Sequence, residues 1–174
     1  MHKEEGILMR KRLLLLSAVL LFFLTSCGKL PDMRELLAYQ EGPLTMALRI
    51  TDEEIFHASV TLGSDVITLT MNENTKAEGI SFSRCEDGAL WVSFDGLTHK
   101  LPAGNLSKAS VWLAIFTLSP DGLWKIKRDT MGGIAVFVCT ETETAVTVYI
   151  DAATLLPLKI TQGSLSVDVT SVTH

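Results

Sequence analysis

The sequence has few cysteines and histidines, and no apolar run long enough to span a membrane. Its 174 residues include three Cys and four His, and the apolar stretch at residues 13–24 has only twelve positions. A spanning helix needs about 20. The sequence contains no Cys-x-x-Cys pair, no His-Glu-x-x-His motif and no Gly-x-Ser-x-Gly motif. We therefore expect no metal, no cofactor and no enzyme activity.

What the chain does contain is a leader of the lipoprotein type. A basic triplet, Arg10-Lys11-Arg12, precedes the apolar residues 13–24, and Leu24-Thr25-Ser26-Cys27 follows. A basic start, a short apolar core and small residues before cleavage are typical of a secretory signal. The last four residues resemble the bacterial lipobox, in which a diacylglyceryl group is joined to the cysteine thiol. We predict a signal peptide at residues 1–26 and lipidation of Cys27; the alternative is an ordinary signal peptide with an incidental cysteine.

The leader also predicts a location. A lipid on Cys27 anchors the protein to the cell membrane on its extracytoplasmic side, at the cell surface or in the periplasm of a bacterium. One acyl chain binds only marginally, whereas the two or three chains of a lipoprotein anchor durably. A start at Met9 places Met-Arg-Lys-Arg directly before the apolar core and leaves out Glu4 and Glu5. We therefore expect Met9 to be the true start.

Positive charge is scarce in the mature part. Removing residues 1–26 leaves 148 residues with 11 basic and 18 acidic side chains, a net charge near −7. Such a surface repels nucleic-acid phosphates and anionic lipid headgroups. We expect no nucleic-acid partner, and we expect the membrane contact to come from the lipid on Cys27.

Two cysteines remain once Cys27 is acylated. Cys85 and Cys139 both lie at the ends of strand-like runs. An exported protein can form a disulfide between such residues, and the alternative is a pair of buried thiols that behave as small apolar side chains. We predict that the two are not bridged and that the fold does not depend on them.

Alternating apolar and polar residues dominate the chain from residue 44 onward, which is the pattern of half-buried strands. The first strand, for example, has Leu44, Met46, Leu48 and Ile50 on one face. Asp95-Gly96 is a strong hairpin signal, because two-residue turns need positive φ. The pattern predicts antiparallel strands at residues 44–51, 55–62, 67–71, 80–82, 90–94, 97–101, 123–127, 134–139, 145–150, 158–161 and 165–169.

Two segments have helical spacing instead. Residues 106–118 carry Trp112 and Phe116 four positions apart, and residues 31–40 predict a shorter helix. The predicted organisation is a leader at 1–26, the lipidated Cys27 with a short tether and helix at 27–42, and one mainly β (α+β) domain at 43–174.

The element order and a late hairpin resemble a known family. Residues 149–160 read Tyr-Ile-Asp-Ala-Ala-Thr-Leu-Leu-Pro-Leu-Lys-Ile, similar to that family's strand ending in Asp, turn with Thr and Pro-Leu strand. Together with the lipobox, the chain resembles the lipoprotein-carrier superfamily of LolA, LolB and the mycobacterial lipoproteins that share their fold. The resemblance implies a curved antiparallel sheet forming a half-open β-barrel, lidded by the short N-terminal helix and the central amphipathic helix. Leu155 stands where the family commonly has glycine, which predicts a differently formed turn.

The candidate ligand site is the apolar face of this sheet together with the lidding helix. A curved sheet under a movable helix tends to leave a concave apolar space, the usual form of a small-molecule site. For each residue the alternative is an ordinary filled core. The candidates for lining the cavity are Met46, Leu48, Phe56, Val60, Leu69, Phe82, Trp112 and Phe116.

These observations predict an anchored extracytoplasmic lipoprotein whose concave apolar face binds a lipid or other hydrophobic ligand, as a carrier or a sensor. The alternative is an anchored interaction or structural module of the cell envelope, with a filled core, no ligand and envelope proteins as partners. A residual cavity between sheet and helix favours the first, and a packed interior favours the second.

Overall fold

The computed structural model describes residues 31–72, 77–85, 87–102, 108–128, 134–139 and 145–173. The predicted signal peptide, the lipidation site at Cys27 and the first two residues of the predicted 106–118 helix lie outside this range. The chain divides into two units, Met1–Pro31 and Asp32–His174. The fold described below is that of the second unit.

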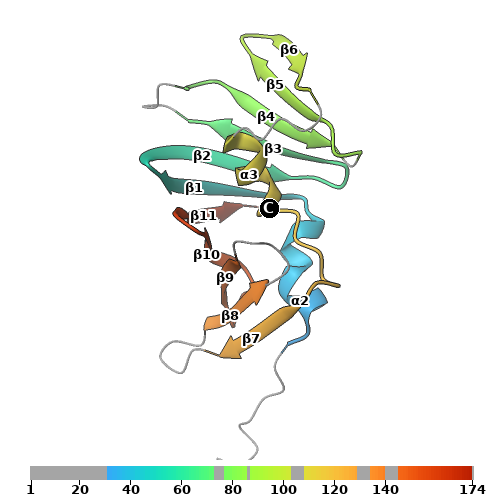
Figure 1. The fold of residues 1–174 in the computed structure, drawn as a ribbon, viewed down its shortest axis with the longest axis vertical. Helices are drawn as coiled ribbons and strands as arrows, with labels where there is room; N and C mark the ends of the chain where they lie inside the picture. The colour runs from blue at the N-terminus through green and yellow to red at the C-terminus, as the bar shows by residue number, and fades with distance from the viewer. Residues whose placement is uncertain are drawn as a thin grey trace, which may run out of the picture. The chain divides into compact units, whose positions relative to one another are not determined.

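The described residues form one open antiparallel sheet of eleven strands (Figure 1). The strand order is β6-β5-β4-β3-β2-β1-β11-β10-β9-β8-β7, so β6 and β7 are its two edges. Neighbouring strands in the sheet are consecutive in the sequence except β1 and β11, which pair with each other at the centre of the sheet. The strands are β1 (Leu44–Asp52), β2 (Glu54–Leu62), β3 (Val66–Met71), β4 (Ser81–Cys85), β5 (Leu90–Phe94), β6 (Leu97–Lys100), β7 (Trp124–Arg128), β8 (Ile134–Cys139), β9 (Val146–Asp151), β10 (Pro157–Gln162) and β11 (Leu165–Thr173).

Three short helical segments accompany the sheet in the described part of the chain. The α-helix α2 (Met33–Leu37) continues into the 3₁₀-helix η1 (Ala38–Glu41), and the α-helix α3 (Lys108–Ala114) connects the two edge strands in sequence. A capping box starts α2: the Asp32 carboxylate accepts from the Glu35 amide at 2.9 Å, and the Glu35 side chain accepts from the Asp32 amide at 3.2 Å.

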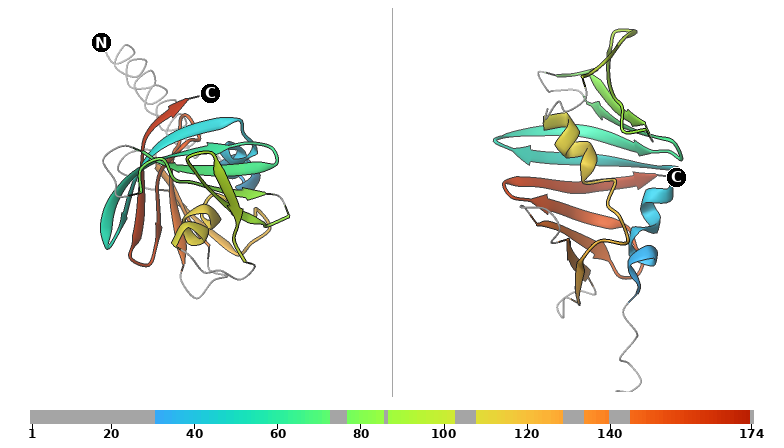
Figure 2. Two further views of the ribbon diagram at one scale, coloured as in Figure 1. Left: turned by 90° about the horizontal axis from the view of Figure 1, so that it is seen from above. Right: turned by 45° about the vertical axis from the view of Figure 1, so that its right-hand side comes forward.

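Period-two alternation places one face of the sheet against the helices. Along β1, Leu44, Met46, Leu48 and Ile50 are buried while the residues between them are at least partly exposed. Side chains from α2, η1 and α3 join these strand residues in a single hydrophobic cluster. The helical segments therefore pack on the core face of the sheet, here called the inner face (Figure 2).

The mainly β class is confirmed, and a strand is present at each position predicted from the sequence. Two strands are longer than predicted: β4 ends at Cys85 instead of residue 82, and β11 ends at Thr173 instead of residue 169. The Asp95-Gly96 turn is also confirmed, with φ of 49° and 76°. The predicted 106–118 helix is too long at its C-terminal end. It stops at Ala114, because the Phe116 and Thr117 amides bond three residues back, to Leu113 and Ala114, and tighten the chain into turns.

The late hairpin is built around Asp151. Its carboxylate accepts hydrogen bonds from the Ala153 and Thr154 amides at 2.8 and 2.9 Å, and its carbonyl accepts from the Leu155 amide at 2.8 Å. Leu155 has φ of 57°, in the left-handed region that glycine enters without steric cost. The turn thus adopts a conformation that glycine favours although it carries a leucine.

Candidate functional site

The structure brings the eight predicted cavity residues together in one cluster. Phe56 and Phe82 are half-buried and pack against it. Phe56 meets Trp112 with ring centroids 5.2 Å apart and a tilt of 52°, a favourable aromatic geometry. The other six are buried core residues: Met46, Leu48, Val60, Leu69, Trp112 and Phe116.

The centre of this cluster is filled by side chains. Met46, Val60 and Leu69 have no accessible surface at all. A side chain bordering a water-sized void would retain accessible surface, so these three are in contact with protein on every side, as in a normal interior. Any space for a ligand on the inner face must therefore lie beyond them.

Such space lies toward the β6 edge. In the strand register Phe82 is paired with Leu69 on one side and Val92 on the other, and Phe94 is paired with Leu97. Directly paired residues share a face of the sheet, so these side chains continue the inner face outward from the core. We call this surface the apolar arm; its residues are Phe82, Leu90, Val92, Phe94 and Leu97.

Burial falls steadily along the apolar arm. Leu69 on β3 is fully buried, Phe82 and Val92 are half-buried, and Phe94 and Leu97 are 55% and 77% exposed. The arm is thus an apolar surface, continuous with the core, that is only partly covered. Among its residues only Phe82 was a sequence-based candidate. Alternation identified the strand face of Leu90, Val92 and Phe94, but it carries no signal for where the covering helices stop.

A hollow of about 370 Å³ adjoins the arm near β3 and β4. Its apolar lining includes Phe116 and Leu118, and its polar lining includes Arg84, Gln40 and Asp65. Arg84 pairs with Ile67 and Leu90 in the register, which places it on the inner face two residues from Phe82. Its Nη1 donates to Thr117 Oγ1 at 3.4 Å, a long hydrogen bond.

Two buried polar atoms of η1 make no hydrogen bond of good geometry with any described residue: the Tyr39 hydroxyl and Gln40 Nε2. Burial raises the pKa of the Tyr39 hydroxyl far above its ordinary value, and a hydrogen-bond interaction with the neighbouring Gln40 side chain lowers it by a smaller amount. That interaction does not have the distance and angles of a full hydrogen bond, so the hydroxyl remains largely unsatisfied. Gln40 lines the hollow at Arg84 and also a second one of about 370 Å³ that includes Arg34 and Leu37. Nothing in the sequence pattern singled out Tyr39, Gln40 or Arg84.

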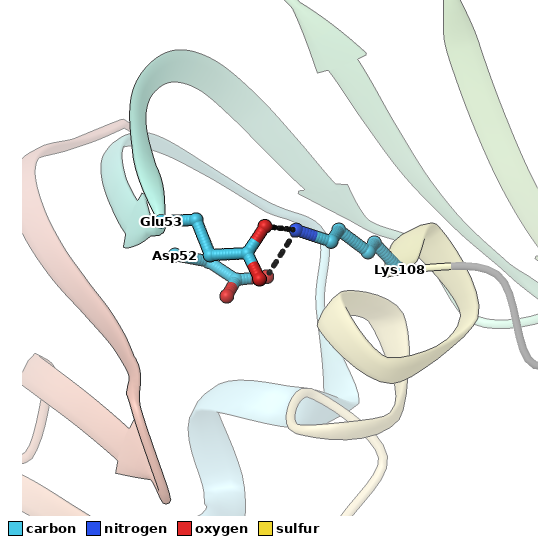
Figure 3. A network of polar contacts seen from close by, with 3 residues as sticks. All are labelled: Asp52, Glu53 and Lys108. Carbon is cyan, nitrogen blue, oxygen red and sulfur yellow. Dashed lines mark hydrogen bonds and ion pairs between the residues drawn. The ribbon is translucent and has the colours of Figure 1, made fainter.

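An ion pair joins the start of α3 to the β1–β2 turn (Figure 3). Lys108 Nζ lies 2.7 Å from Glu53 Oε2 and 3.7 Å from Asp52 Oδ2. The hydrogen bond between Lys108 and Glu53 raises the pKa of the lysine and lowers that of the carboxylate. Both charged groups are exposed, so the contact orients α3 more than it stabilises the fold.

The remaining predicted positions are placed as follows. Cys85 is a free, half-buried thiol on β4; Cys139 lies on β8, and six strands separate β4 from β8 in the strand order. Across the described ranges, no group of three or more His, Cys, Asp or Glu residues is arranged to hold a metal ion. Within those same ranges, the helices are too short to cross a membrane.

Comparison with known proteins indicates a fold and no family. No protein-family model matches the sequence, and no curated protein matches it. One similar solved structure is an uncharacterized conserved protein from Thermus thermophilus, with 16% identity, a TM-score of 0.53, and coverage of 81% of this chain and 86% of that one. Another is PNGF-II, with 16% identity over 75% of this chain and 27% of that one, but its TM-score of 0.40 is too low to support an argument. At such identities the likeness to the Thermus protein concerns the fold alone.

Proposed function

We propose that this chain is a lipid-anchored, extracytoplasmic envelope protein that binds the acyl chain of a lipid on the inner face of its sheet. In this proposal the sheet is a half-open barrel, and α2 and α3 are its lids. The ligand lies along the apolar arm, beyond the filled centre of the core. The role is that of a carrier or sensor.

The observation that supports this proposal is the uncovered continuation of the core. The apolar arm combines half-buried Phe82 and Val92 with exposed Phe94 and Leu97 on one face. Scattered exposed apolar side chains are normal, whereas contiguous apolar surface indicates a binding site. Removing an acyl chain and this surface from water stabilises a complex by roughly 25 cal/mol per Å².

In this proposal α3 controls access to the ligand. The α3 helix carries Trp112 and Leu113 into the core, and the Lys108–Glu53 ion pair links its first turn to the β1–β2 hairpin. A helix of seven residues has little stability of its own, so these tertiary contacts hold it in place. Displacement of α3 would extend the open surface from the arm toward Phe116.

The anchoring part of the proposal is tested at Cys27. Replacing Cys27 with Ala should abolish metabolic labelling by a fatty-acid analogue and leave the chain unprocessed or released from the membrane. Undiminished labelling of the variant would refute lipidation at this residue.

The ligand part is tested by a charge on the apolar arm. Phe116 is a candidate cavity residue, but Phe116→Asp cannot serve as the test. Phe116 is a fully buried core residue, and a charge there would unfold the protein. Phe94 is 55% exposed, so Phe94→Asp should fold normally and weaken binding of a fluorescent fatty acid. The matched control is His57→Asp, an exposed position of β2, whose register partner Arg49 lies between inward-facing Leu48 and Ile50.

A second candidate is favoured by one observation, the open edge at β6. All four residues of β6 are exposed, and within the described residues it pairs only with β5. An unpaired edge can accept a strand from a partner. Equal affinity of Phe94→Asp, His57→Asp and the unaltered protein for the fatty acid, or no binding by any of them, would favour this interaction module.

A further inference from the structure

The hollow at Arg84 has the features of a site for a negatively charged group. Arginine is rarely placed on a core face unless it is paired, and yet no acidic side chain among the described residues lies within 4.0 Å of Arg84. A guanidinium has five N–H donors, and the hydrogen bond to Thr117, at 3.4 Å, uses one of them. Among the described residues the other donors have no acceptor within hydrogen-bond distance, and they can bind an oxyanion.

Gln40 supplies a second, independent observation. Its Nε2 is buried and makes no hydrogen bond of good geometry with any described residue, and Gln40 lines the same hollow. A buried donor without an acceptor costs free energy. A rotation of the Gln40 side chain toward a ligand oxygen in the hollow would remove that cost. Asp65 also lines the hollow, but it is exposed to solvent and forms no ion pair with Arg84, so water screens its repulsion of an anion.

Arg84 links the hollow to the apolar arm, because it lines the hollow and lies beside the arm on the same face of the sheet. Arg84 pairs with Leu90, and Phe94 lies four residues further along the same face of β5. At about 3.3 Å per residue, the two ends of this row are roughly 13 Å apart. One end therefore offers hydrogen-bond donors and a positive charge, and the rest offers mainly apolar side chains, with His99 beside Val92 at the β6 edge.

We propose that the hollow binds the oxyanion of a single-chain amphiphile, with Arg84 and Gln40 as donors, while the acyl chain lies along the apolar arm. This inference rests on the proposed function, and it names the ligand class as an anionic amphiphile such as a fatty acid. Arg84 thereby sets both the direction of the chain and the preference for a charged head. Charge-assisted hydrogen bonds are roughly twice as strong as neutral ones.

The test compares a charged and an uncharged amphiphile of equal chain length. The unit Asp32–His174 contains the whole core cluster and is used for calorimetric titration at pH 8 with dodecanoate, dodecanol and inorganic phosphate. We expect dodecanoate to bind at least about tenfold more tightly than dodecanol, and Arg84→Gln to remove that difference without changing the affinity for dodecanol. Arg84→Lys, which retains the charge, should keep part of the preference.

The matched control is Arg49→Gln, the same substitution at an exposed residue between inward-facing Leu48 and Ile50 on β1, which should change neither affinity. Equal binding of the two amphiphiles, or a preference that survives Arg84→Gln, would overturn the assignment of the hollow while leaving acyl binding intact. Failure of both amphiphiles to bind would instead overturn the proposed function as well. Phosphate binding as tight as that of dodecanoate, and lost in Arg84→Gln, would show a free-anion site and overturn the amphiphile assignment.

Discussion

Replacing Tyr39 with Phe should stabilise the protein. Tyr39 is only 7% exposed, and its hydroxyl makes no hydrogen bond of good geometry with any described residue. The weaker interaction with Gln40 offsets little of the effect of burial on the hydroxyl pKa. Phenylalanine retains the aromatic ring and therefore its packing in the core cluster. The substitution removes only a polar atom that burial has separated from water.

The size of the effect follows from the cost of burying an unpaired polar group, about 1–3 kcal/mol. The small void left by the oxygen offsets part of the gain. We expect the free energy of unfolding to rise by about 1 kcal/mol. For a domain of this size, that corresponds to a rise in the melting temperature of about 3 °C.

The same residue predicts a dependence on pH. Burial raises the pKa of Tyr39 in the folded protein, whereas the unfolded chain releases this proton near pH 10. The contribution of protonated Tyr39 to the free energy of unfolding is therefore fully present below about pH 10. Above that pH the free energy of unfolding falls, by up to about 1.4 kcal/mol per pH unit. Because phenylalanine does not titrate, the advantage of Tyr39→Phe should grow above pH 10.

Urea unfolding of the unaltered protein and of Tyr39→Phe at pH 7, 10 and 11 measures both effects. Tyr149→Phe is the control, since Tyr149 is the other tyrosine in the chain and is only half-buried on β9. It should change stability little at any of these pH values. A loss of stability in Tyr39→Phe would show that the hydroxyl is satisfied. A difference that stays constant between pH 7 and 11 would show that the hydroxyl is not buried in the folded protein.

Further substitutions test other parts of the fold. Leu48→Ala removes a buried side chain from β1 and should lower the free energy of unfolding by about 2–5 kcal/mol; a loss below about 1 kcal/mol in urea would contradict a filled core. Asp151→Ala should lower the free energy of unfolding at pH 7 and much less at pH 2. Hydrogen bonds from Thr154 and Ala153 lower the pKa of Asp151, so the stabilisation by this carboxylate is present above its ordinary pKa and lost as the pH falls. Equal losses of stability at both pH values would argue against this role of Asp151. Lys108→Ala should speed amide hydrogen exchange in α3 at low salt, and unchanged exchange would show that the ion pair does not hold the helix.

The strands could be predicted from the sequence because one physical signal specifies them. Leu44, Met46, Leu48 and Ile50 alternate with polar residues, and a sheet with one buried face requires that spacing. The end of α3 could not be predicted in the same way. Ile115 and Phe116 have apolar side chains at helical spacing and are both buried, but they reach the core from turns instead of a helix.

The candidate site was predicted only in part, because its exposure depends on what covers the sheet. Alternation places Phe82 and Leu69 on the same face, yet only Leu69 lies fully under the helices. Arg84 and Gln40 are more than forty residues apart in the sequence and line one hollow only through the folding of the sheet. No local spacing connects them, so a sequence pattern has no signal for this pair.

The most direct test of acyl-chain binding is native mass spectrometry of Asp32–His174 purified from bacterial cells, followed by addition of dodecanoate. We predict a population heavier by one single-chain amphiphile, which is abolished or strongly reduced in Phe94→Asp and retained in His57→Asp. A mass equal to that of the bare chain, together with no binding of added dodecanoate at micromolar concentration, would contradict the account.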